Sequence, residues 1–99
     1  MKTQLIWDET KRQSNLIKHG LDFADAMEVL DARYRLDIDI VRGSELRTQS
    51  FAYVMGILRV LTVVHTRRED AVRIISFRRA STKEREDYYA WTEYHSHDN

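Results

Sequence analysis

The segment Arg73-Ile74-Ile75-Ser76-Phe77-Arg78-Arg79-Ala80, followed by Ser81-Thr82-Lys83-Glu84-Arg85-Glu86-Asp87-Tyr88, decides how this chain folds. Its first half is rich in β-branched and aromatic residues and predicts a strand over 72–79. Its second half predicts a helix over 83–94. Ser81 or Thr82 can cap that helix, and Glu84 or Arg85 stands where a capping box places its third residue. We therefore expect a strand that leads directly into a C-terminal helix.

The chain before this segment predicts three further strands. Alternation of apolar and polar residues indicates a half-buried strand over 34–41, and a turn is expected near Gly43-Ser44. Strands are also expected over 48–55 and 58–66, and the short connections favour antiparallel hairpins. Because 60–64 is apolar at every position but Thr62, that strand is predicted to be central and covered on both faces.

The N-terminal third predicts a short strand and two helices. Residues 4–7 form the strand, and Asp8 can cap a helix over 9–19 that ends before Gly20, where a left-handed conformation is easy. A second helix is expected from Asp22. Its apolar face would consist of Phe23, Ala26, Met27 and Leu30, which fall at helical spacing.

These elements predict one α+β domain over 1–94, with a frayed tail over 95–99. Two N-terminal helices pack on a mainly antiparallel sheet of four to five strands, and a C-terminal helix follows. The chain has 99 residues, 42% of them hydrophobic, so a single core is expected. The absence of Cys excludes disulfides and thiolate catalysis. No apolar run is long enough to span a bilayer, and we expect a cytoplasmic protein with no membrane partner.

Positive charge is concentrated around the last predicted strand. Residues 59–85 hold eight Lys or Arg against three Asp or Glu, residues 1–58 hold eight against nine, and residues 86–99 hold none against four. Guanidinium groups donate paired hydrogen bonds and stay charged, so they suit phosphate. An anionic substrate, RNA above all, is the leading hypothesis. A solvated face of arginines paired with carboxylates is the alternative.

Strict alternation along the last strand separates its arginines. Arg73 and Phe77 would point one way and Arg78 the other, so a single register cannot place all three arginines of this strand on one face. Arg68, at the end of the preceding strand, is expected near Arg73 across the hairpin. Arg78 and Arg79 must diverge for the same reason. The internal acidic partners available nearby are Glu69, Asp70 and Glu84.

Histidines and aromatic residues offer further chemistry. His19 lies at a helix end and either caps that end or transfers a proton, whereas His65 is either a hydrogen-bonded core residue or a catalytic one. His95 and His97 with Asp98 have a weak metal-ligand spacing, and we predict no metal site. The aromatic residues of the last helix could stack on bases or pack on the sheet. They are Tyr88, Tyr89, Trp91 and Tyr94.

The order of motifs resembles that of a known family. The motifs are Trp7-Asp8-Glu9, Lys11, Asn15, Lys18-His19-Gly20-Leu21, Phe23, Ala26, Glu45, Arg47, Gly56, Thr66, Arg68, Arg73-Ile74-Ile75-Ser76, Arg78-Arg79-Ala80, Glu84-Arg85 and Tyr88. This pattern is similar to BrnT, the toxin of a type II toxin–antitoxin pair, and it extends over most of the chain. The resemblance implies a fold similar to the RelE and ParE toxins and a ribonuclease activity that restrains translation and growth.

The resemblance also implies a partner. The expected antitoxin is of the BrnA type and carries a ribbon-helix-helix DNA-binding part, so operator DNA would be bound only through the toxin–antitoxin complex. The sequence departs from the family pattern at His65, where tyrosine is frequent, at Phe77, where a small residue is usual, and at Ser44, where glycine is common. Phe77 could change the shape of the cleft, and His65 could change which group moves a proton.

The hypothesis is metal-independent and cofactor-free cleavage, in which the ribose 2′-hydroxyl attacks the adjacent phosphorus. The products are a 2′,3′-cyclic phosphate and a 5′-hydroxyl. Arg68, Arg73 and Arg78 are the predicted catalytic cations, and His19 or Glu84 the group that transfers a proton. Lys18, Arg79 and Tyr88 are predicted to bind RNA. The alternatives are a non-catalytic antitoxin-binding co-repressor, whose arginines grip acidic side chains, and a nucleic-acid-binding module.

Overall fold

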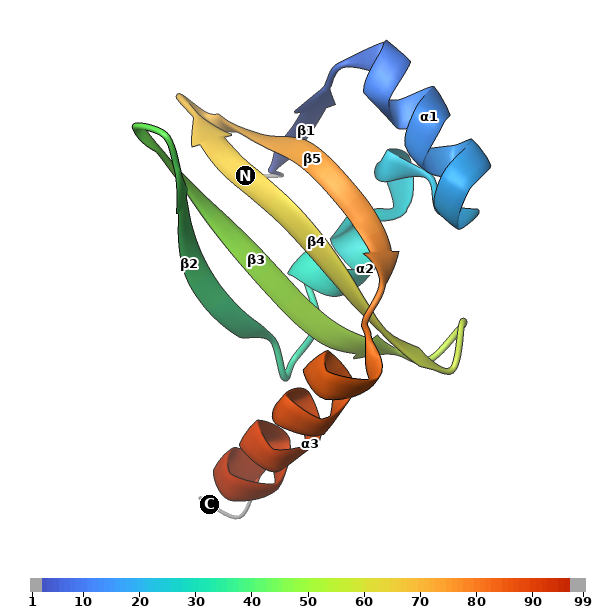
Figure 1. Ribbon diagram of the computed structural model, residues 1–99, viewed down its shortest axis with the longest axis vertical. Coiled ribbons are helices and arrows are strands. Elements are labelled where there is room, and N and C mark those ends of the chain that lie inside the picture. Colours follow the sequence, from blue (N-terminus) through green and yellow to red (C-terminus); the bar gives the residue numbers. More distant parts are fainter. Residues whose placement is uncertain (1–2, 97–99) are drawn as a thin grey trace.

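The computed structural model describes residues 3–96, in which five strands form one sheet in the order β1-β5-β4-β3-β2 (Figure 1). The strands are β1 (Gln4–Trp7), β2 (Leu36–Arg42), β3 (Glu45–Val54), β4 (Arg59–Arg68) and β5 (Ala71–Arg79). β1 pairs with β5 in parallel, and the other three pairings are antiparallel. The sheet is therefore mixed and not purely antiparallel, because the first and last strands of the chain pair side by side in parallel. The predicted central position of β4 is confirmed.

The helices follow the predicted order with one correction. α1 (Glu9–His19) is confirmed at both ends: the Asp8 carboxylate accepts from the backbone of Thr10 and Lys11, and Gly20 has φ 71°. The predicted second helix is split into a 3-10 turn, η1 (Phe23–Asp25), and a four-residue helix, α2 (Met27–Leu30). The Asp22 side chain caps η1 by accepting from the amide of Ala24, which starts a tight turn and not a long helix.

The C-terminal helix, α3 (Thr82–Ser96), begins one residue earlier and continues two residues further than predicted. His95 lies within it, and one ring nitrogen of His95 is 2.9 Å from the carbonyl oxygen of Trp91. The rest of the predicted frayed tail, and with it His97 and Asp98, lies outside the described residues. None of the helices in 3–96 is both long and apolar enough to cross a bilayer.

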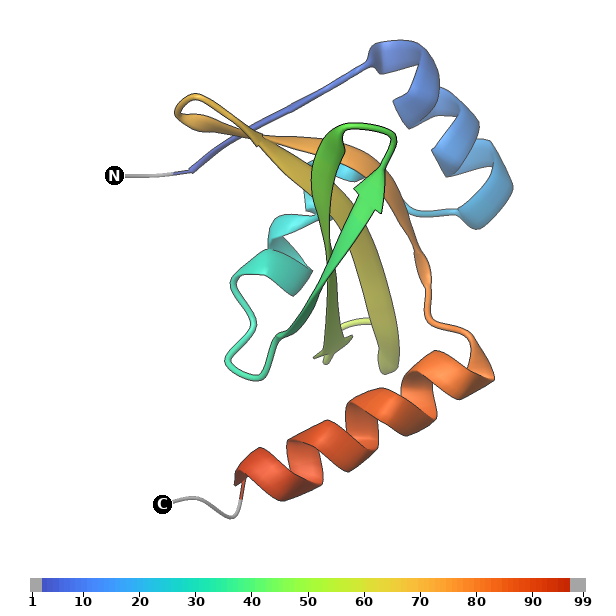
Figure 2. The same ribbon diagram turned by 60° about the vertical axis from the view of Figure 1, so that its left-hand side comes forward.

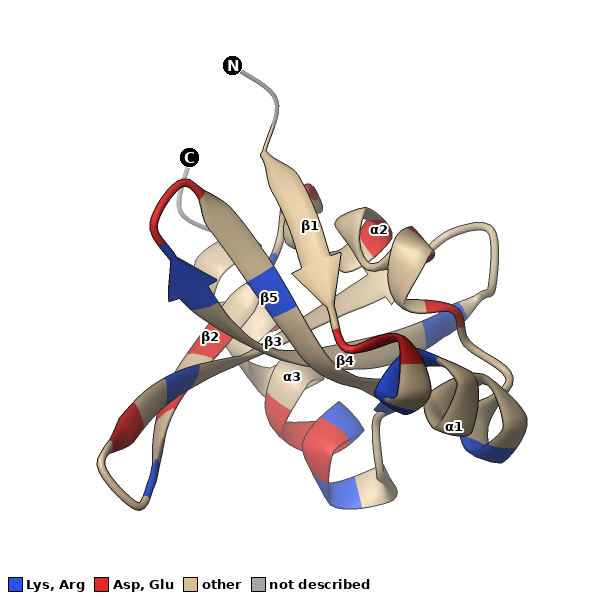
Figure 3. Cartoon of the chain, turned by 90° about the horizontal axis from the view of Figure 1, so that it is seen from above, with Lys and Arg blue, Asp and Glu red and all other residues tan. Residues whose placement is uncertain are grey.

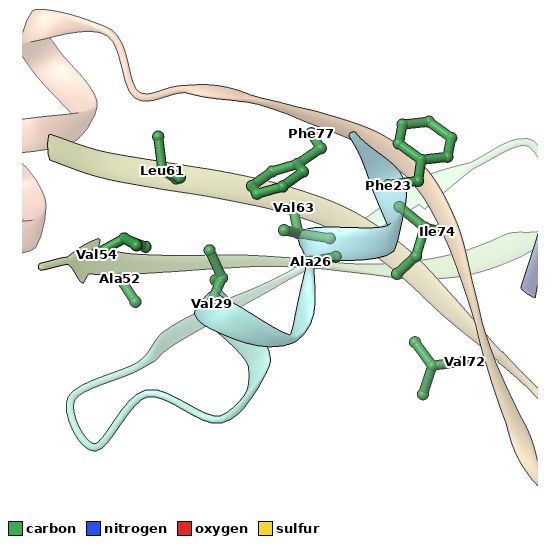
Figure 4. Packing of buried hydrophobic residues seen from close by; sticks show 10 residues of the cluster. All are labelled: Phe23, Ala26, Val29, Ala52, Val54, Leu61, Val63, Val72, Ile74 and Phe77. Atoms are coloured by element: carbon green, nitrogen blue, oxygen red, sulfur yellow. The ribbon is translucent and has the colours of Figure 1, made fainter. Parts of the chain in front are cut away.

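The main core lies between the sheet and the η1–α2 segment, on what we call the helix-covered face (Figure 4). Phe23, Ala26 and Val29 from this segment are fully buried against the sheet. The sheet contributes Ala52, Val54, Leu61, Val63, Val72, Ile74 and Phe77. Full burial of each large apolar side chain stabilises the fold by about 1.5–3 kcal/mol. Phe77 therefore belongs to the core and does not shape a cleft beside Arg78, contrary to the expectation from its size.

The opposite face of the sheet is covered only at one end. α3 packs there through Tyr88, which forms a second buried cluster with Phe51, Val60 and Ala80. α3 crosses below the sheet, on the side away from α2, and leaves the upper part of this face open (Figures 1 and 2). The predicted coverage of β4 on both faces is confirmed, because Leu61 and Val63 enter the first cluster and Val60 enters the second.

A register shift in the β4–β5 pairing decides which face each arginine occupies. Val64 pairs with Ser76 but the next residue, His65, pairs with Ile74, so β5 contains one extra residue at Ile75. Such a bulge interrupts the alternation of side chains. Arg78 pairs with Thr62 and Arg73 with Thr66. Because Thr62 and Thr66 are four residues apart on a regular strand, Arg73 and Arg78 lie on the same face. The prediction of opposite faces is wrong.

α1 lies beside β5, at the edge that β1 does not reach (Figure 1). There the side chain of Asn15 donates to the carbonyl oxygen of Phe77 at 2.7 Å and accepts from its amide at 3.2 Å. The same amide group of Asn15 donates to the carbonyl oxygen of Leu21 at 3.0 Å. Asn15 is 8% exposed. Its side chain makes the two backbone hydrogen bonds to Phe77 that a neighbouring strand would otherwise make, and these bonds fix the position of α1 and of its C-terminal end.

Asn15→Ala tests this edge contact. We expect the free energy of unfolding to fall by about 1–3 kcal/mol, because two buried backbone groups of Phe77 lose their partner. Urea titration measures it, with Ser14→Ala, an exposed change on the same helix, as the matched control. Equal stability of the two variants would show that α1 is held in place without this contact.

Candidate nucleic-acid interface

Arg68, Arg73 and Arg78 lie on the same face of the sheet, opposite α2, which we call the cationic face. Arg68 is two residues beyond Thr66 on β4, and Arg73 and Arg78 pair with Thr66 and Thr62. All three therefore share one face. Basic positions at the end of β4 and within β5 lie on either side of the acidic turn that joins the strands (Figure 3). Arg79 pairs with Leu61 and belongs to the other face, so the predicted divergence of Arg78 and Arg79 is confirmed.

Arg78 is held at the base of α3 by a bidentate ion pair with Glu84. Its two terminal nitrogens donate to the two carboxylate oxygens at 2.8 and 3.0 Å. Glu84 also accepts from the amide of Ser81 at 2.8 Å, and the Ser81 hydroxyl accepts from the amide of Glu84 at 3.2 Å. This reciprocal pair is the predicted capping box. The hydrogen bonds from Arg78 lower the pKa of Glu84 to about 2, so its carboxylate stays ionised.

At the other end of the cationic face, Glu45 lies between two arginines. It accepts from Arg47 at 2.7 Å and from Arg68 at 3.2 Å. The hydrogen bond from Arg47 lowers the pKa of Glu45, and the charges of Arg47, Arg68 and Arg73 act in the same direction. One carboxylate thus faces three guanidinium groups.

Arg73 differs from its neighbours because its charge has no carboxylate in contact. Among residues 3–96 it forms neither an ion pair nor a side-chain hydrogen bond. With Arg68, Ile6 and Trp7 it lines an open cavity of about 270 Å³. A guanidinium group in this setting is free to donate to an incoming anion.

His19 and Lys18 end α1 close to β5. Burial lowers the pKa of His19, and the charges of Lys18 and Arg78 lower it further. His19 is therefore neutral at neutral pH and able to accept a proton. The effect of Arg78 on this imidazole places it within electrostatic reach of the cationic face. Lys18 is exposed beside it.

Tyr88 and His65, two candidates from the sequence, are not available for contacts on the cationic face. Tyr88, predicted to contact RNA, is only 3% exposed. Its hydroxyl donates to the carbonyl oxygen of Tyr34 at 2.8 Å and accepts from the amide of Tyr53 at 3.2 Å. This ring holds α3 against the sheet and has no free face for a base. His65 lies on the helix-covered face, where its Nε2 is 2.8 Å from the Ser50 hydroxyl, as expected of a hydrogen-bonded histidine.

The sequence reasoning missed three polar neighbours of the site on β3. Glu45 and Arg47 flank Arg68, and Gln49 donates to Glu84 at 3.3 Å. They alternate along β3, which is the signal that could have assigned them to one face. The predicted strand over 48–55 began too late to include the first two.

The structure is an α+β fold with a mixed five-stranded sheet, one face of which carries several arginines. The sequence model of one family, described as the ribonuclease toxin BrnT of type II toxin–antitoxin systems, matches residues 7–84. The chain belongs to this family of ribonuclease toxins, whose members act in systems with an antitoxin partner. The matched range begins at Trp7, the last residue of β1, contains β2 to β5 and ends at Glu84. No curated protein matches the chain.

The Arg78–Glu84 pair predicts a pH dependence of stability. The pKa of Glu84 falls from 4.5 to about 2 on folding, so the pair stabilises the fold above about pH 4.5. That contribution is lost as the pH falls toward about 2. We expect Glu84→Gln to lower the free energy of unfolding by about 1–3 kcal/mol at pH 7 and by progressively less below pH 4.5. Urea titrations at pH 7 and pH 3 measure it, with the exposed Glu86→Gln as control. A loss that does not shrink at pH 3 would contradict this origin.

Proposed function

We propose that the chain is a metal-independent endoribonuclease that cleaves RNA on the cationic face by attack of a ribose 2′-hydroxyl on the adjacent phosphorus. The observation that carries the proposal is the placement of Arg68, Arg73 and Arg78 on one face through the bulge at Ile75. In such a reaction the phosphorus passes through a state with extra negative charge on its oxygens. Fixed cations around that charge lower the barrier without being consumed.

The three arginines have different roles in this proposal. Arg73 binds the scissile phosphate directly, because no carboxylate competes for its donors within the described chain. Arg68 shares Glu45 with Arg47 and keeps further donors for the same phosphate or the next one. Arg78 is fixed in direction by both oxygens of Glu84 and contributes its charge at the α3 end of the face. Lys18 is proposed to contact the RNA that flanks the scissile phosphate, whereas Arg79, on the other face, is given no role in binding on the cationic face.

His19 is the better candidate for the group that accepts the proton of the 2′-hydroxyl. It is neutral near pH 7, since burial and two nearby cations lower its pKa. Glu84 is a weak base because its pKa is about 2, and its oxygens already accept from Arg78, Ser81 and Gln49. We therefore propose that Glu84 positions Arg78 and that His19 moves the proton.

The biological context follows from the family and is proposed for this chain. Cleavage of RNA would restrain translation and growth in the cytoplasm, and a BrnA-type antitoxin with a ribbon-helix-helix part would neutralise it. Operator DNA would be bound only by the toxin–antitoxin complex. A fold relationship with RelE and ParE is part of the same proposal, supported by a sheet that has helices on one face and a cationic surface on the other.

The arginine assignment predicts a loss of activity without a loss of fold. We expect Arg73→Ala to slow RNA cleavage about a hundredfold, because removal of one preorganised donor raises the barrier by roughly 3 kcal/mol. Arg68→Ala and Arg78→Ala should act in the same direction. Single-turnover cleavage of a defined RNA by the purified variants measures it.

Arg59→Ala is the matched control, because Arg59 is an exposed arginine at the far end of β4. Thermal unfolding of each variant verifies that it is folded. Cleavage by Arg73→Ala at the rate of Arg59→Ala would remove the cationic face from the mechanism. Growth arrest without any RNA cleavage would instead favour a toxin that acts by binding.

The proton-transfer assignment predicts the pH–rate profile, measured with EDTA present throughout. Wild type should remain active, form a 2′,3′-cyclic phosphate and slow down as the pH falls through the lowered pKa of His19, where the ring becomes protonated. His19→Gln should be at least tenfold slower near pH 7, and its rate should not show this decrease. Loss of wild-type activity in EDTA, or an unchanged profile in His19→Gln, would contradict the mechanism.

A further inference from the structure

A second polar cavity lies on the helix-covered face, away from the three arginines of the proposed site. Its volume is about 290 Å³. It opens between the end of α2 and the parts of β2 to β5 that lie beyond the buried core. The lining residues used below are Asp31, Arg35, Asp37, Thr48, His65 and Arg67. The proposed mechanism assigns no role to this cavity.

A chain of hydrogen bonds fixes the His65 ring at the wall of this cavity. The Ser50 hydroxyl is 2.6 Å from the Asp37 carboxylate and 2.8 Å from Nε2 of His65. A carboxylate only accepts, so the Ser50 hydroxyl donates to Asp37 and must accept from Nε2–H of His65. In the neutral ring, Nδ1 is then the unprotonated nitrogen, and it has no hydrogen-bond partner among residues 3–96.

This arrangement is not that of a serine hydrolase. Ser50 is 0% exposed and lies between the carboxylate and the imidazole, so no substrate can reach its oxygen. The free position in the network is Nδ1 of His65. When that nitrogen is protonated, it is a donor whose ring is held in place by the chain behind it.

The charges around the ring favour an anion. Arg67 is exposed and forms no ion pair within 3–96, and it lies two residues from His65 on the same side of β4. Arg35 binds Asp37 at 3.0 Å and donates to the carbonyl oxygen of Leu30 at 2.6 Å. Burial and the charges of Arg35 and Arg67 lower the pKa of His65, and Asp37 acts in the opposite direction. Asp31, at the rim, is the remaining carboxylate.

Arg67 also connects this cavity with the cationic face. Arg67 and Arg68 are consecutive on β4, so their side chains point to opposite faces at the same end of the sheet. The β4–β5 turn is at this end, and so is the β2–β3 turn (Figure 1). A single strand that crosses this end of the sheet would meet Arg68 on one side and Arg67 on the other.

We propose that this cavity is a second phosphate subsite, in which Arg67 and Nδ1–H of protonated His65 hold a phosphate of the RNA strand that occupies the cationic face. The inference rests on the proposed function for the identity of the ligand as RNA. An anion between Arg67 and His65 offsets the cation that disfavours protonation, so binding and uptake of one proton by His65 are coupled.

The test follows the His65 ring by NMR as the intact protein is titrated with three probes: inorganic phosphate, a 5′-mononucleotide and a short 2′-O-methyl oligoribonucleotide that cannot be cleaved. We expect the mononucleotide and the oligonucleotide to shift the His65 resonances saturably, to raise the pKa of His65 and to bind more tightly as the pH falls. Arg67→Ala should abolish these changes, and Arg59→Ala, which alters an exposed arginine of the same strand, should retain them.

Salt dependence gives a second measure. For the oligonucleotide, the slope of log K against log salt is negative, and its magnitude should be smaller by about 0.7 in Arg67→Ala, as expected when one phosphate contact to a single strand is lost. His65 resonances that do not respond to either nucleotide probe, or that respond equally in Arg67→Ala, would overturn the inference. A response to inorganic phosphate but not to the oligonucleotide would overturn the assignment to RNA.

Failure here and failure of the proposed function are distinguishable. Arg73→Ala should lose cleavage yet keep the response of His65 to the mononucleotide. If wild type cleaves RNA while His65 does not respond, the second subsite is wrong and the proposed function stands. If His65 responds while wild type cleaves no RNA, the second subsite stands and the proposed ribonuclease function is wrong.

Discussion

The bulge at Ile75 is the feature on which the proposed site depends. Without it, β5 would alternate strictly, and placing Ile74 in the core would put Arg78 there too. With one extra residue, Ile74 and Phe77 both enter the helix-covered face, and Arg73 and Arg78 both leave it. The same bulge therefore places the apolar side chains in the core and the arginines on the cationic face. Its position is fixed from the other side by Asn15, which binds both backbone groups of Phe77.

The junction between β5 and α3 joins this face to the rest of the molecule. Glu84 is at once the third residue of a capping box and the partner of Arg78. One carboxylate thus sets the start of the helix and the direction of a guanidinium group on the strand. Tyr88, one turn further on, anchors the helix through a buried ring and two hydrogen bonds. These contacts explain why an otherwise polar helix stays at the lower end of the sheet and leaves the upper part of the face open.

Carboxylates on the cationic face limit its positive charge but do not cancel it. Arg78 is matched by Glu84, and Glu45 serves both Arg47 and Arg68. The more exposed Arg68–Glu45 pair contributes only about 0–1 kcal/mol, so a phosphate can compete for the donors of Arg68. Arg73 contacts no carboxylate within residues 3–96, so a phosphate would reach its donors without displacing one. This uneven pairing favours a specific phosphate position near Arg73 over a uniformly basic surface, which fits a chain whose net charge is +0.

Most helices and strands could be predicted from the sequence, because their signals are local. Asp8 and Gly20 set the ends of α1, the Ser81 to Glu84 spacing set the start of α3, and the apolar run 60–64 marked the central strand. Which side chains meet depends on how distant segments of the chain pack together. The parallel return of β1, the division of the second helix and the bulge at Ile75 arise from packing between distant segments, which leaves no local pattern. Strict alternation therefore assigned Arg73 to the wrong face, and the contacts of Glu45 with Arg68 and of Gln49 with Glu84 join segments that are far apart in the chain.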